Sequence, residues 1–324
     1  MRHLGNVYSF YVEKWKKLNA CACLKLIFAF FVIIFVTYLL SIFSYLLNEF
    51  VFQSNIYNTE CDRCRGAATE SSQIASFPRH IHQVYYPQDG SSELPVRLQN
   101  TQRSCRVQNP DYAYTLWDEQ RVLKLINEDY PELLNLYLSY EKWIWRVDMA
   151  RYLFIYHYGG FYLDMDMECI QGLEAIREGA ERNRSSVVVR MTDPVGFSND
   201  LFAATPRHPF MCSVVTALPH AKRWFVFPYA TNMYSIGTTF FWGRYLNNPR
   251  KSEFHILPHY RDYIVHYHDS SWHHWDGKVV WYFFNHAFLF WTLLAIIFIC
   301  IGVIYIYFLK VESTIDVVKS LRHV

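Results

Sequence analysis

Two long apolar stretches constrain the fold of this 324-residue chain more than any other feature. Residues 26–47 and 288–309 each run for 22 positions without a charged side chain. As helices with a rise of about 1.5 Å per residue, each would extend about 33 Å, which matches the hydrocarbon core of a bilayer. We therefore predict two transmembrane helices with one large segment between them.

The charges around these stretches predict their orientation. Basic residues precede the first stretch and follow the second: Lys14, Lys16, Lys17, Lys25, Lys310, Lys319 and Arg322. The positive-inside rule then places residues 1–25 and the tail, 310–324, in the cytosol and the intervening segment in the lumen or outside the cell. The alternative for the first stretch is a cleaved signal peptide. A retained anchor is favoured because the run exceeds a usual apolar region and no A-x-A-like site follows Leu47.

Composition and patterning describe the segment between the two stretches. With 31 basic and 29 acidic residues and 52% hydrophobic residues, the chain is neither disordered nor built to bind nucleic acid. Residues 48–75 are polar without periodicity and are typical of a stem. Residues 76–276 have the size of a single α/β domain.

Short apolar runs alternate with helical patterns in this domain. We predict strands at 80–85, 112–117, 161–163 and 186–191, and helices at 118–126, from 131, at 142–156 and from 209. Asp118 should cap the first of these helices, and the glycine pair at 159–160 should end the third. This alternation predicts an α/β fold with a largely parallel sheet, whose ligands bind at the carboxyl ends of the strands.

The cysteines and one sequon fit a lumenal location. Five cysteines fall in the predicted lumenal segment, so one or two disulfides are expected, with the pairing left open: Cys61, Cys64, Cys105, Cys169 and Cys212. Asn183 begins an Asn-Arg-Ser sequon and is a candidate for glycosylation, with an unused match to a short pattern as the alternative.

Two acidic patterns point to chemistry. Asp164 and Asp166 follow the strand at 161–163, and two carboxylates so placed can hold a hard divalent cation. A surface turn with two solvated aspartates is the alternative. Asp148 and Arg151 share one face of the helix at 142–156, which is crowded with apolar side chains. The alternative to a ligand site there is an intrahelical salt bridge.

These patterns together resemble a known family. R-x-D-x-x-R-Y at 146–152, followed by H-Y-G-G-x-Y-x-D-x-D at 157–166, closely resembles the DXD sugar-binding glycosyltransferases. That family includes fungal α-mannosyltransferases and inositol phosphoceramide mannosyltransferases, and the clostridial glucosylating toxins are distant relatives. Further segments match in order: 77–87, 109–119, 196–210 (with SND and PRHPF) and 268–276 (with SSWH). The likeness is strongest to the inositol phosphoceramide mannosyltransferases, although Val147 replaces a usual alanine and Arg79-His80 replaces Lys-Ile.

The resemblance implies a fold, a reaction and a setting. It implies a GT-A-like, Rossmann-type glycosyltransferase domain flanked by an N-terminal and a C-terminal transmembrane helix, and it implies transfer with retention of anomeric configuration. It favours GDP-mannose as donor, Mn²⁺ or Mg²⁺ as cofactor and inositol phosphoceramide as lipid acceptor, at a Golgi membrane with the domain in the lumen. In that system the catalytic subunit works with a multispanning regulatory subunit, which leaves such a partner open for this chain.

The resemblance also assigns roles to residues. Asp166 is expected to bind the metal directly, with Asp164, Ser271 and His273 completing the metal site. The donor is expected to contact His82, Gln83, Asp148, Arg151, Tyr152, Asp164 and Trp272. Asn199 and Asp200 are expected near the sugar and the acceptor hydroxyl, and count with Asp164 and Asp166 as catalytic candidates. For His266, His268 and His274, an interfacial position beside the membrane is an equal alternative.

Two other functions remain open at this point. A transferase of the same kind could use a UDP-hexose and another glycolipid or glycan. A protein of another class could bind sugar nucleotide or glycolipid without turnover, although the intact acidic and SSWH motifs disfavour it.

Overall fold

The computed structural model describes residues 76–87, 93–192, 196–225, 227–257, 259–268, 275–286 and 292. Its elements, in chain order, are β1 (His80–Val84), α4 (Val96–Gln108), β2 (Ala113–Trp117), α5 (Glu119–Asp129), η2 (Pro131–Leu133), α6 (Leu134–Leu138), α7 (Trp143–Tyr158), β3 (Gly160–Leu163), β4 (Met167–Cys169), α8 (Glu174–Arg182), β5 (Val187–Met191), β6 (Phe197–Ala204), α9 (Pro209–Ala221), α10 (Pro228–Ser235), α11 (Thr238–Leu246), η3 (Lys251–Glu253), β7 (Phe254–Leu257), η4 (Tyr260–Asp262), β8 (Ile264–His266) and α12 (Trp275–Asn285).

Six strands form one mixed sheet in the order β2-β1-β3-β6-β5-β7. The pairs β1–β2, β1–β3 and β5–β7 are parallel, whereas β6 runs antiparallel to both of its neighbours, β3 and β5. Two further strands, β4 and β8, form a separate antiparallel pair in which Met167 faces His266.

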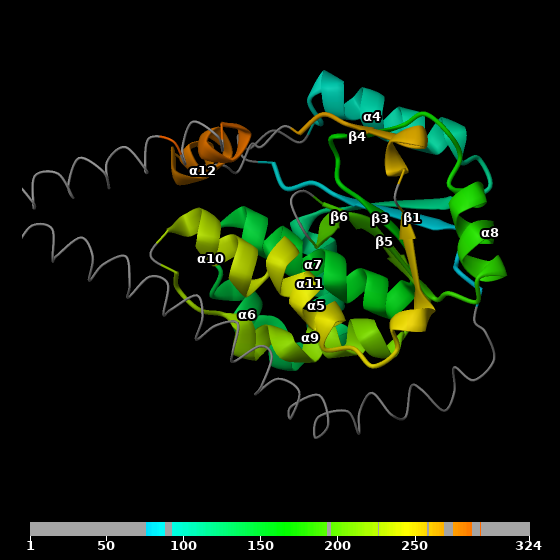
Figure 1. The fold of residues 1–324 in the computed structure, drawn as a ribbon. Helices are drawn as coiled ribbons and strands as arrows, with labels where there is room; N and C mark the ends of the chain where they lie inside the picture. The colour runs from blue at the N-terminus through cyan, green and yellow to red at the C-terminus, as the bar shows by residue number, and fades with distance from the viewer. Residues whose placement is uncertain are drawn as a thin grey trace, which may run out of the picture. The chain divides into compact units, whose positions relative to one another are not determined.

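The central strands are buried on both faces, and alternate side chains enter two separate cores. Tyr162, Val189 and Phe202 belong to the core that the sheet shares with α5, α7, α9 and α11. Phe161 and Val188 point to the opposite face, into the core that includes residues of α4, β4 and α8. Figure 1 shows these helices on the two sides of the sheet.

Most predicted elements are confirmed within one or two residues. The Asp118 side chain accepts a hydrogen bond from the Arg121 amide at the start of α5, as a capping residue should. The α/β class is confirmed as well, but the expectation of a largely parallel sheet is wrong. The antiparallel strand β6 accounts for the difference. It follows β5 closely in the chain and pairs with it, and the Thr192 N–H donates to the Gly196 carbonyl (2.9 Å) between the two strands.

Steric constraints explain why two glycines follow α7. Gly159 ends the helix with φ of 68°, and its amide bonds the Ile155 carbonyl. Gly160 opens β3 with φ of 93°, and a Cβ there would lie 2.5 Å from the carbonyl oxygen of His80. Only glycine therefore lets β3 start so close to β1 and deliver the D-x-D segment to the end of the sheet.

Several predicted segments lie outside the described residues: the stem at 48–75 and, apart from Thr292, both apolar stretches. Among the residues that are described, no helix is both apolar enough and long enough to traverse a bilayer. The described residues between 76 and 277 belong to one structural unit, which contains the elements discussed below.

Candidate active site

The D-x-D segment forms a tight turn at the carboxyl end of β3. The Asp164 amide donates to the carbonyl of Asp200 on β6 (2.9 Å), and the Met167 amide donates back to the Asp164 carbonyl (3.1 Å). Asp164 and Asp166 therefore lie at the carboxyl end of β3, where α/β folds bind their ligands.

Asp164 lies against the guanidinium of Arg151 and the hydroxyl of Tyr162. Arg151 Nη1 is 3.3 Å from Asp164 Oδ1, and the Tyr162 hydroxyl donates to the same oxygen. Burial raises the pKa of Asp164; Arg151 opposes this, but the nearby carboxylates of Asp166 and Asp200 raise it further. Asp164 is thus a carboxylate close to two others, an arrangement that favours the binding of a proton or of a cation.

Asp148 and Arg151 form a buried pair on α7. Arg151 Nη2 is 3.2 Å from Asp148 Oδ1, and both side chains are less than 5% exposed. Burial raises the pKa of Asp148 to about 6, although Arg151 and the amide of Asn199 lower it. Within the described residues, Asp148 Oδ2 and Arg151 Nε have no hydrogen-bond partner. Buried polar atoms are seldom left unpaired, so these two atoms are candidates to meet a ligand.

Asn199 connects the strand β6 to this pair. Its Nδ2 donates to Asp148 Oδ1 (2.9 Å), while its backbone carbonyl accepts from Arg151 Nη1 (2.8 Å). The side-chain oxygen accepts from Thr238 at the start of α11 (3.2 Å). A fourth hydrogen bond runs from Nδ2 to the Tyr152 hydroxyl (3.0 Å). Asn199 is thus fixed by four hydrogen bonds and holds the Asp148–Arg151 pair in place.

Asp200 is held by two residues that sequence reasoning did not assign to the site. Arg190 on β5 grips both carboxylate oxygens of Asp200, with Nε 2.6 Å from Oδ1 and Nη2 on Oδ2. His266 on β8 lies between two carboxylates, with Nδ1 3.4 Å from Asp200 Oδ2 and Nε2 3.3 Å from Asp166 Oδ2. Burial opposes ionisation of Asp200, but Arg190 lowers its pKa overall.

The signal for these two residues was present but weak. Arg190 is a charge inside the otherwise apolar run SVVVRM, which is unusual for a buried strand. His266 ends a three-residue strand whose partner, β4, directly follows the D-x-D turn. Burial lowers the pKa of His266, but Asp166 and Asp200 outweigh it and raise the pKa. The His266 ring is about 10% exposed and faces two carboxylates of the site.

Two residues that are predicted to contact the sugar donor, His82 and Tyr152, are hydrogen-bonded within the protein. His82 is fully buried, its Nε2 lies 3.0 Å from the Gly159 carbonyl and its Nδ1 accepts from Trp117 Nε1 (3.0 Å). The hydroxyl of Tyr152 donates to the Ile236 carbonyl (2.8 Å) and accepts from Asn199. These side-chain atoms are thus bonded within the protein and support the site, and contact of either residue with the sugar donor stays a prediction.

The remaining predicted residues are placed as follows. Gln83 donates from Nε2 to the Asp164 carbonyl (3.2 Å) and accepts from the Tyr114 hydroxyl (2.7 Å), so it contacts the D-x-D turn. Asn183 lies exposed at the end of α8. Ser271, Trp272 and His273 lie outside the described residues.

The donor set suits a hard divalent cation. Asp164 and Asp166 offer carboxylate oxygens, the ligands that Mg²⁺ and Mn²⁺ prefer. In the described part of the chain, no three His, Cys, Asp or Glu side chains are arranged as a metal-binding group. Two of the four predicted ligands, Ser271 and His273, are not in that part. The excess of carboxylates that raises the pKa of Asp164 is nevertheless what a bound cation would neutralise.

Comparisons with known proteins agree with this geometry. Residues 95–183 match the family described as a glycosyltransferase sugar-binding region containing a DXD motif. Inositol phosphoceramide mannosyltransferase 1 of Schizosaccharomyces pombe is 31% identical over 250 residues, covering 72% of this chain and 75% of that protein. Inositol phosphoceramide mannosyltransferase 3 of the same organism is 34% identical over 260 residues, covering 76% of this chain and 70% of that protein. Among solved structures, the PaToxG glycosyltransferase aligns with a TM-score of 0.40 and 15% identity, over 63% of this chain and 81% of its own, which is too weak to carry an argument.

Proposed function

The chain belongs to the glycosyltransferases with a DXD-containing sugar-binding region, and we propose that it transfers mannose from GDP-mannose to inositol phosphoceramide. Its relatives carry the names of mannosyltransferases that act on this lipid. Acidic and arginine side chains from α7, β5, β6 and the turn after β3 lie together in one site, which supports the binding of a sugar diphosphate.

One observation carries the proposal most directly. Arg151 is buried between two carboxylates, Asp148 and Asp164, and still has an Nε without a partner among the described residues. A planar guanidinium held in this way can donate to a diphosphate oxygen or a sugar hydroxyl without further ordering. The unpaired Asp148 Oδ2 can accept from a second hydroxyl of the same sugar.

A divalent cation would supply stabilisation of the negative charge that develops on the departing diphosphate. Asp166, with Asp164, Ser271 and His273, is proposed to hold that cation. Asp164 also faces Arg151, so the D-x-D turn joins the proposed metal site to the donor-sugar contacts. His266 Nε2, 3.3 Å from Asp166 Oδ2, orients the carboxylate of Asp166.

The pairing of Asp200 bears on the retaining reaction. Arg190 occupies both carboxylate oxygens of Asp200, and His266 approaches one of them. A carboxylate bound in this way is a poor covalent nucleophile, because attack would first require two charge-assisted bonds to break. We therefore propose attack of the acceptor hydroxyl from the face of the leaving group, with the diphosphate accepting the proton and Asn199 and Asp200 shaping the sugar pocket.

The proposed setting follows from the sequence. The two apolar stretches would hold the lumenal domain at a Golgi membrane, where the headgroup of a lipid can enter the site. In this proposal the fold is of the GT-A type, both termini are cytosolic and a multispanning subunit is a further partner.

A donor screen with a site variant tests the proposal. The full-length protein in detergent is incubated with Mn²⁺ and GDP-mannose, UDP-galactose, UDP-glucose or UDP-N-acetylglucosamine, with and without inositol phosphoceramide. We expect turnover of GDP-mannose that the lipid stimulates. Asp166→Ala should lower turnover at least 100-fold, whereas Asp111→Ala, a change at an exposed residue on the α4–β2 connection, should leave it unaltered.

The other outcomes distinguish the alternatives. Turnover of a UDP-hexose alone would move the function to another hexosyltransferase. Binding of a sugar nucleotide without transfer to any acceptor would indicate a protein of the binding class. Near-normal turnover of Asp166→Ala in Mn²⁺ would refute the proposed metal site.

A further inference from the structure

The backbone of the D-x-D turn is held from three directions. The carbonyl oxygens of residues 164, 165 and 166 accept hydrogen bonds from three different elements. Gln83 on β1 bonds the first (3.2 Å), Thr101 on α4 bonds the second (2.6 Å) and the amide of Tyr267, just after β8, bonds the third (3.1 Å). Each of these three carbonyls has a hydrogen-bond partner within the protein, so the backbone of the turn is held by the fold.

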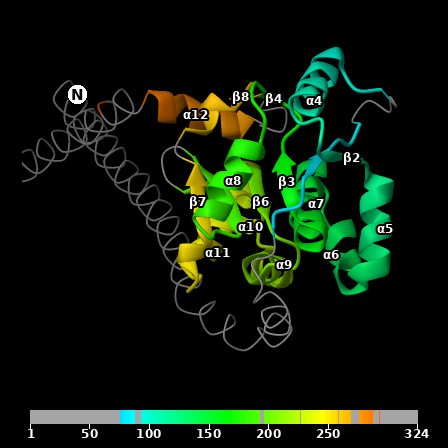
Figure 2. The same ribbon diagram turned by 90° about the vertical axis from the view of Figure 1, so that its right-hand side faces the viewer.

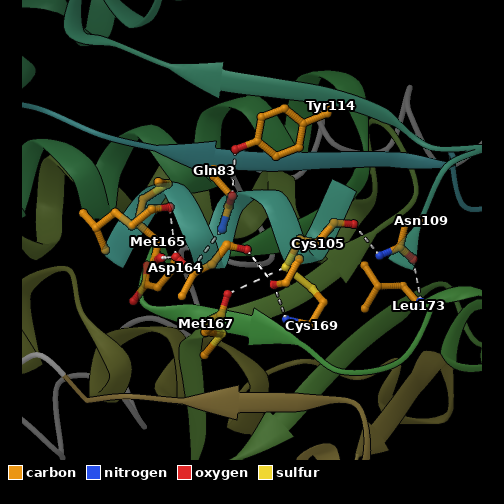
Figure 3. Close-up of a disulfide and its surroundings, with 12 residues drawn as sticks. Gln83, Cys105, Asn109, Tyr114, Asp164, Met165, Met167, Cys169 and Leu173 are labelled. Carbon is orange, nitrogen blue, oxygen red and sulfur yellow. Dashed lines mark hydrogen bonds between the residues drawn. A yellow bond between two sulfur atoms is a disulfide. The ribbon is translucent and has the colours of Figure 1, made fainter. Parts of the chain in front are cut away.

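The contact from α4 is the centre of a larger seam. One face of α4 lies along the segment 165–173 that carries and follows the D-x-D turn, as Figures 2 and 3 show. Besides Thr101, three side chains make this seam: Ser104 accepts from the Cys169 amide (3.0 Å), Cys105 forms a disulfide with Cys169, and Asn109 accepts from the Leu173 amide (2.7 Å). The seam therefore joins α4 to the turn covalently as well as by hydrogen bonds.

Thr101 is placed for the turn rather than for its own helix. Its side chain is buried, and its hydroxyl lies 3.0 Å from the Leu98 carbonyl of α4 but only 2.6 Å from the Met165 carbonyl. A hydroxyl has one proton to donate, so the shorter contact carries the hydrogen bond. Met165 stands between the two aspartates, so this hydrogen bond holds the peptide that joins Met165 to Asp166.

We propose that Thr101 and the Cys105–Cys169 disulfide are positioning residues that hold the D-x-D turn ready for a divalent cation and a sugar diphosphate. The proposal rests on the proposed function, because it takes that site as the one being positioned. Residues behind metal ligands commonly change metal affinity or activity by about 10- to 100-fold when they are altered. A looser turn should therefore weaken cation binding more than it slows turnover at saturating cation.

The test compares variants of the full-length protein. Thr101→Val removes the hydroxyl at nearly constant volume, Thr101→Ser restores it, and Cys105→Ala/Cys169→Ala removes the disulfide. Thr216→Val is the matched control, since the Thr216 hydroxyl bonds only carbonyls of its own helix, α9. Variants are preferred to a reductant because Cys212 is also disulfide-bonded.

Three measurements separate positioning from packing: the Kd for Mn²⁺ by electron paramagnetic resonance, kcat at saturating Mn²⁺, and amide hydrogen exchange at residues 164–167. We expect Thr101→Val and the double cysteine variant to raise the Kd about 10-fold and to speed exchange about 10-fold, with kcat changed less than 3-fold. Thr101→Ser and Thr216→Val should stay within 3-fold of the parent protein in all three.

The outcomes judge the two proposals separately. Unchanged Kd and exchange in Thr101→Val, with only a lower melting temperature, would show that α4 merely packs and would overturn the positioning proposal. If the parent protein binds Mn²⁺ but transfers no sugar, the proposed function fails while the Kd comparison still decides the positioning. If Thr101→Val does not fold, the cysteine variant and Thr101→Ser decide it.

Discussion

The start of β3 offers a sharp test of how the sequence builds this site. Gly160 has φ of 93°, a conformation that costs a residue with a Cβ about 1–3 kcal/mol. An added Cβ would also lie 2.5 Å from the His80 carbonyl oxygen, whereas close carbon–oxygen contacts lie at about 3.3 Å. Since both atoms belong to paired strand backbones, β1 and β3 would have to separate, and such overpacking costs about 1–3 kcal/mol.

We therefore expect Gly160→Ala to lower the free energy of unfolding by about 2–6 kcal/mol. For a unit of this size, about 2–4 °C of melting temperature are lost per kcal/mol, so the midpoint should fall by at least about 4 °C. Thermal unfolding of the full-length protein in detergent, followed by calorimetry, measures the shift.

Gly179→Ala is the matched control, because it is the same chemical change in the opposite environment. Gly179 lies inside α8, and its added Cβ would meet the His255 ring at 3.6 Å and Arg182 Nη2 at 3.8 Å, which are ordinary contact distances. Alanine is the better helix former by about 0.5–1 kcal/mol, so the midpoint should rise by about 1–4 °C. A Gly160→Ala protein as stable as its parent would refute the steric argument, and so would a parallel loss in both variants.

Three further predictions follow from single contacts. Arg190→Met should lower the free energy of unfolding in urea by about 3–5 kcal/mol, because it leaves Asp200 buried without its main partner. The double variant Arg190→Met/Asp200→Asn should lose less stability than Arg190→Met. Equal losses in the two variants would contradict the pairing. His208 Nε2 lies 3.2 Å from Glu253 Oε2, and His208 lowers the pKa of Glu253. The stabilisation from this contact should therefore be complete above the unfolded-chain pKa of about 4.3 and be lost as the pH falls through the lower folded-state pKa. The loss of melting temperature in Glu253→Gln should therefore shrink between pH 6 and pH 3, and a constant loss would exclude this linkage. Asn183 is exposed, so the protein expressed in eukaryotic cells should change its electrophoretic mobility on glycosidase treatment. Asn183→Gln should show no such change. Identical mobility of the parent protein before and after treatment would rule out the glycan.

Sequence reasoning succeeded where the signal is local. The end of α7 was predictable because Gly159 and Gly160 directly follow the helix, and the turn at Asp164 follows directly from the strand before it. The buried pairing of Asp148 with Arg151 was also local, since residues three apart share a helix face.

The central strand β6 was not predicted because its sequence lacks the alternation of apolar and polar residues that marks a strand with one solvent-exposed face. It is buried along its whole length, yet it contains Ser198, Asn199 and Asp200. Polar residues in the middle of a buried strand contradict the usual apolar pattern unless partners elsewhere satisfy them. Those partners, such as Arg190, come from other elements and cannot be assigned from the local sequence.

The two arginines divide the acidic residues of the site into separate roles. Arg190 holds both oxygens of Asp200 and lowers its pKa, so Asp200 is ionised without any cation. Arg151 is shared between Asp148 and Asp164 and cannot neutralise both, and burial with neighbouring carboxylates leaves the pKa of Asp164 raised. The unmet negative charge thus lies at the D-x-D turn rather than at β6. A cation is stabilised where several carboxylates lie close together, which is why we propose the metal at the turn and assign the shaping of the sugar pocket to Asn199 and Asp200.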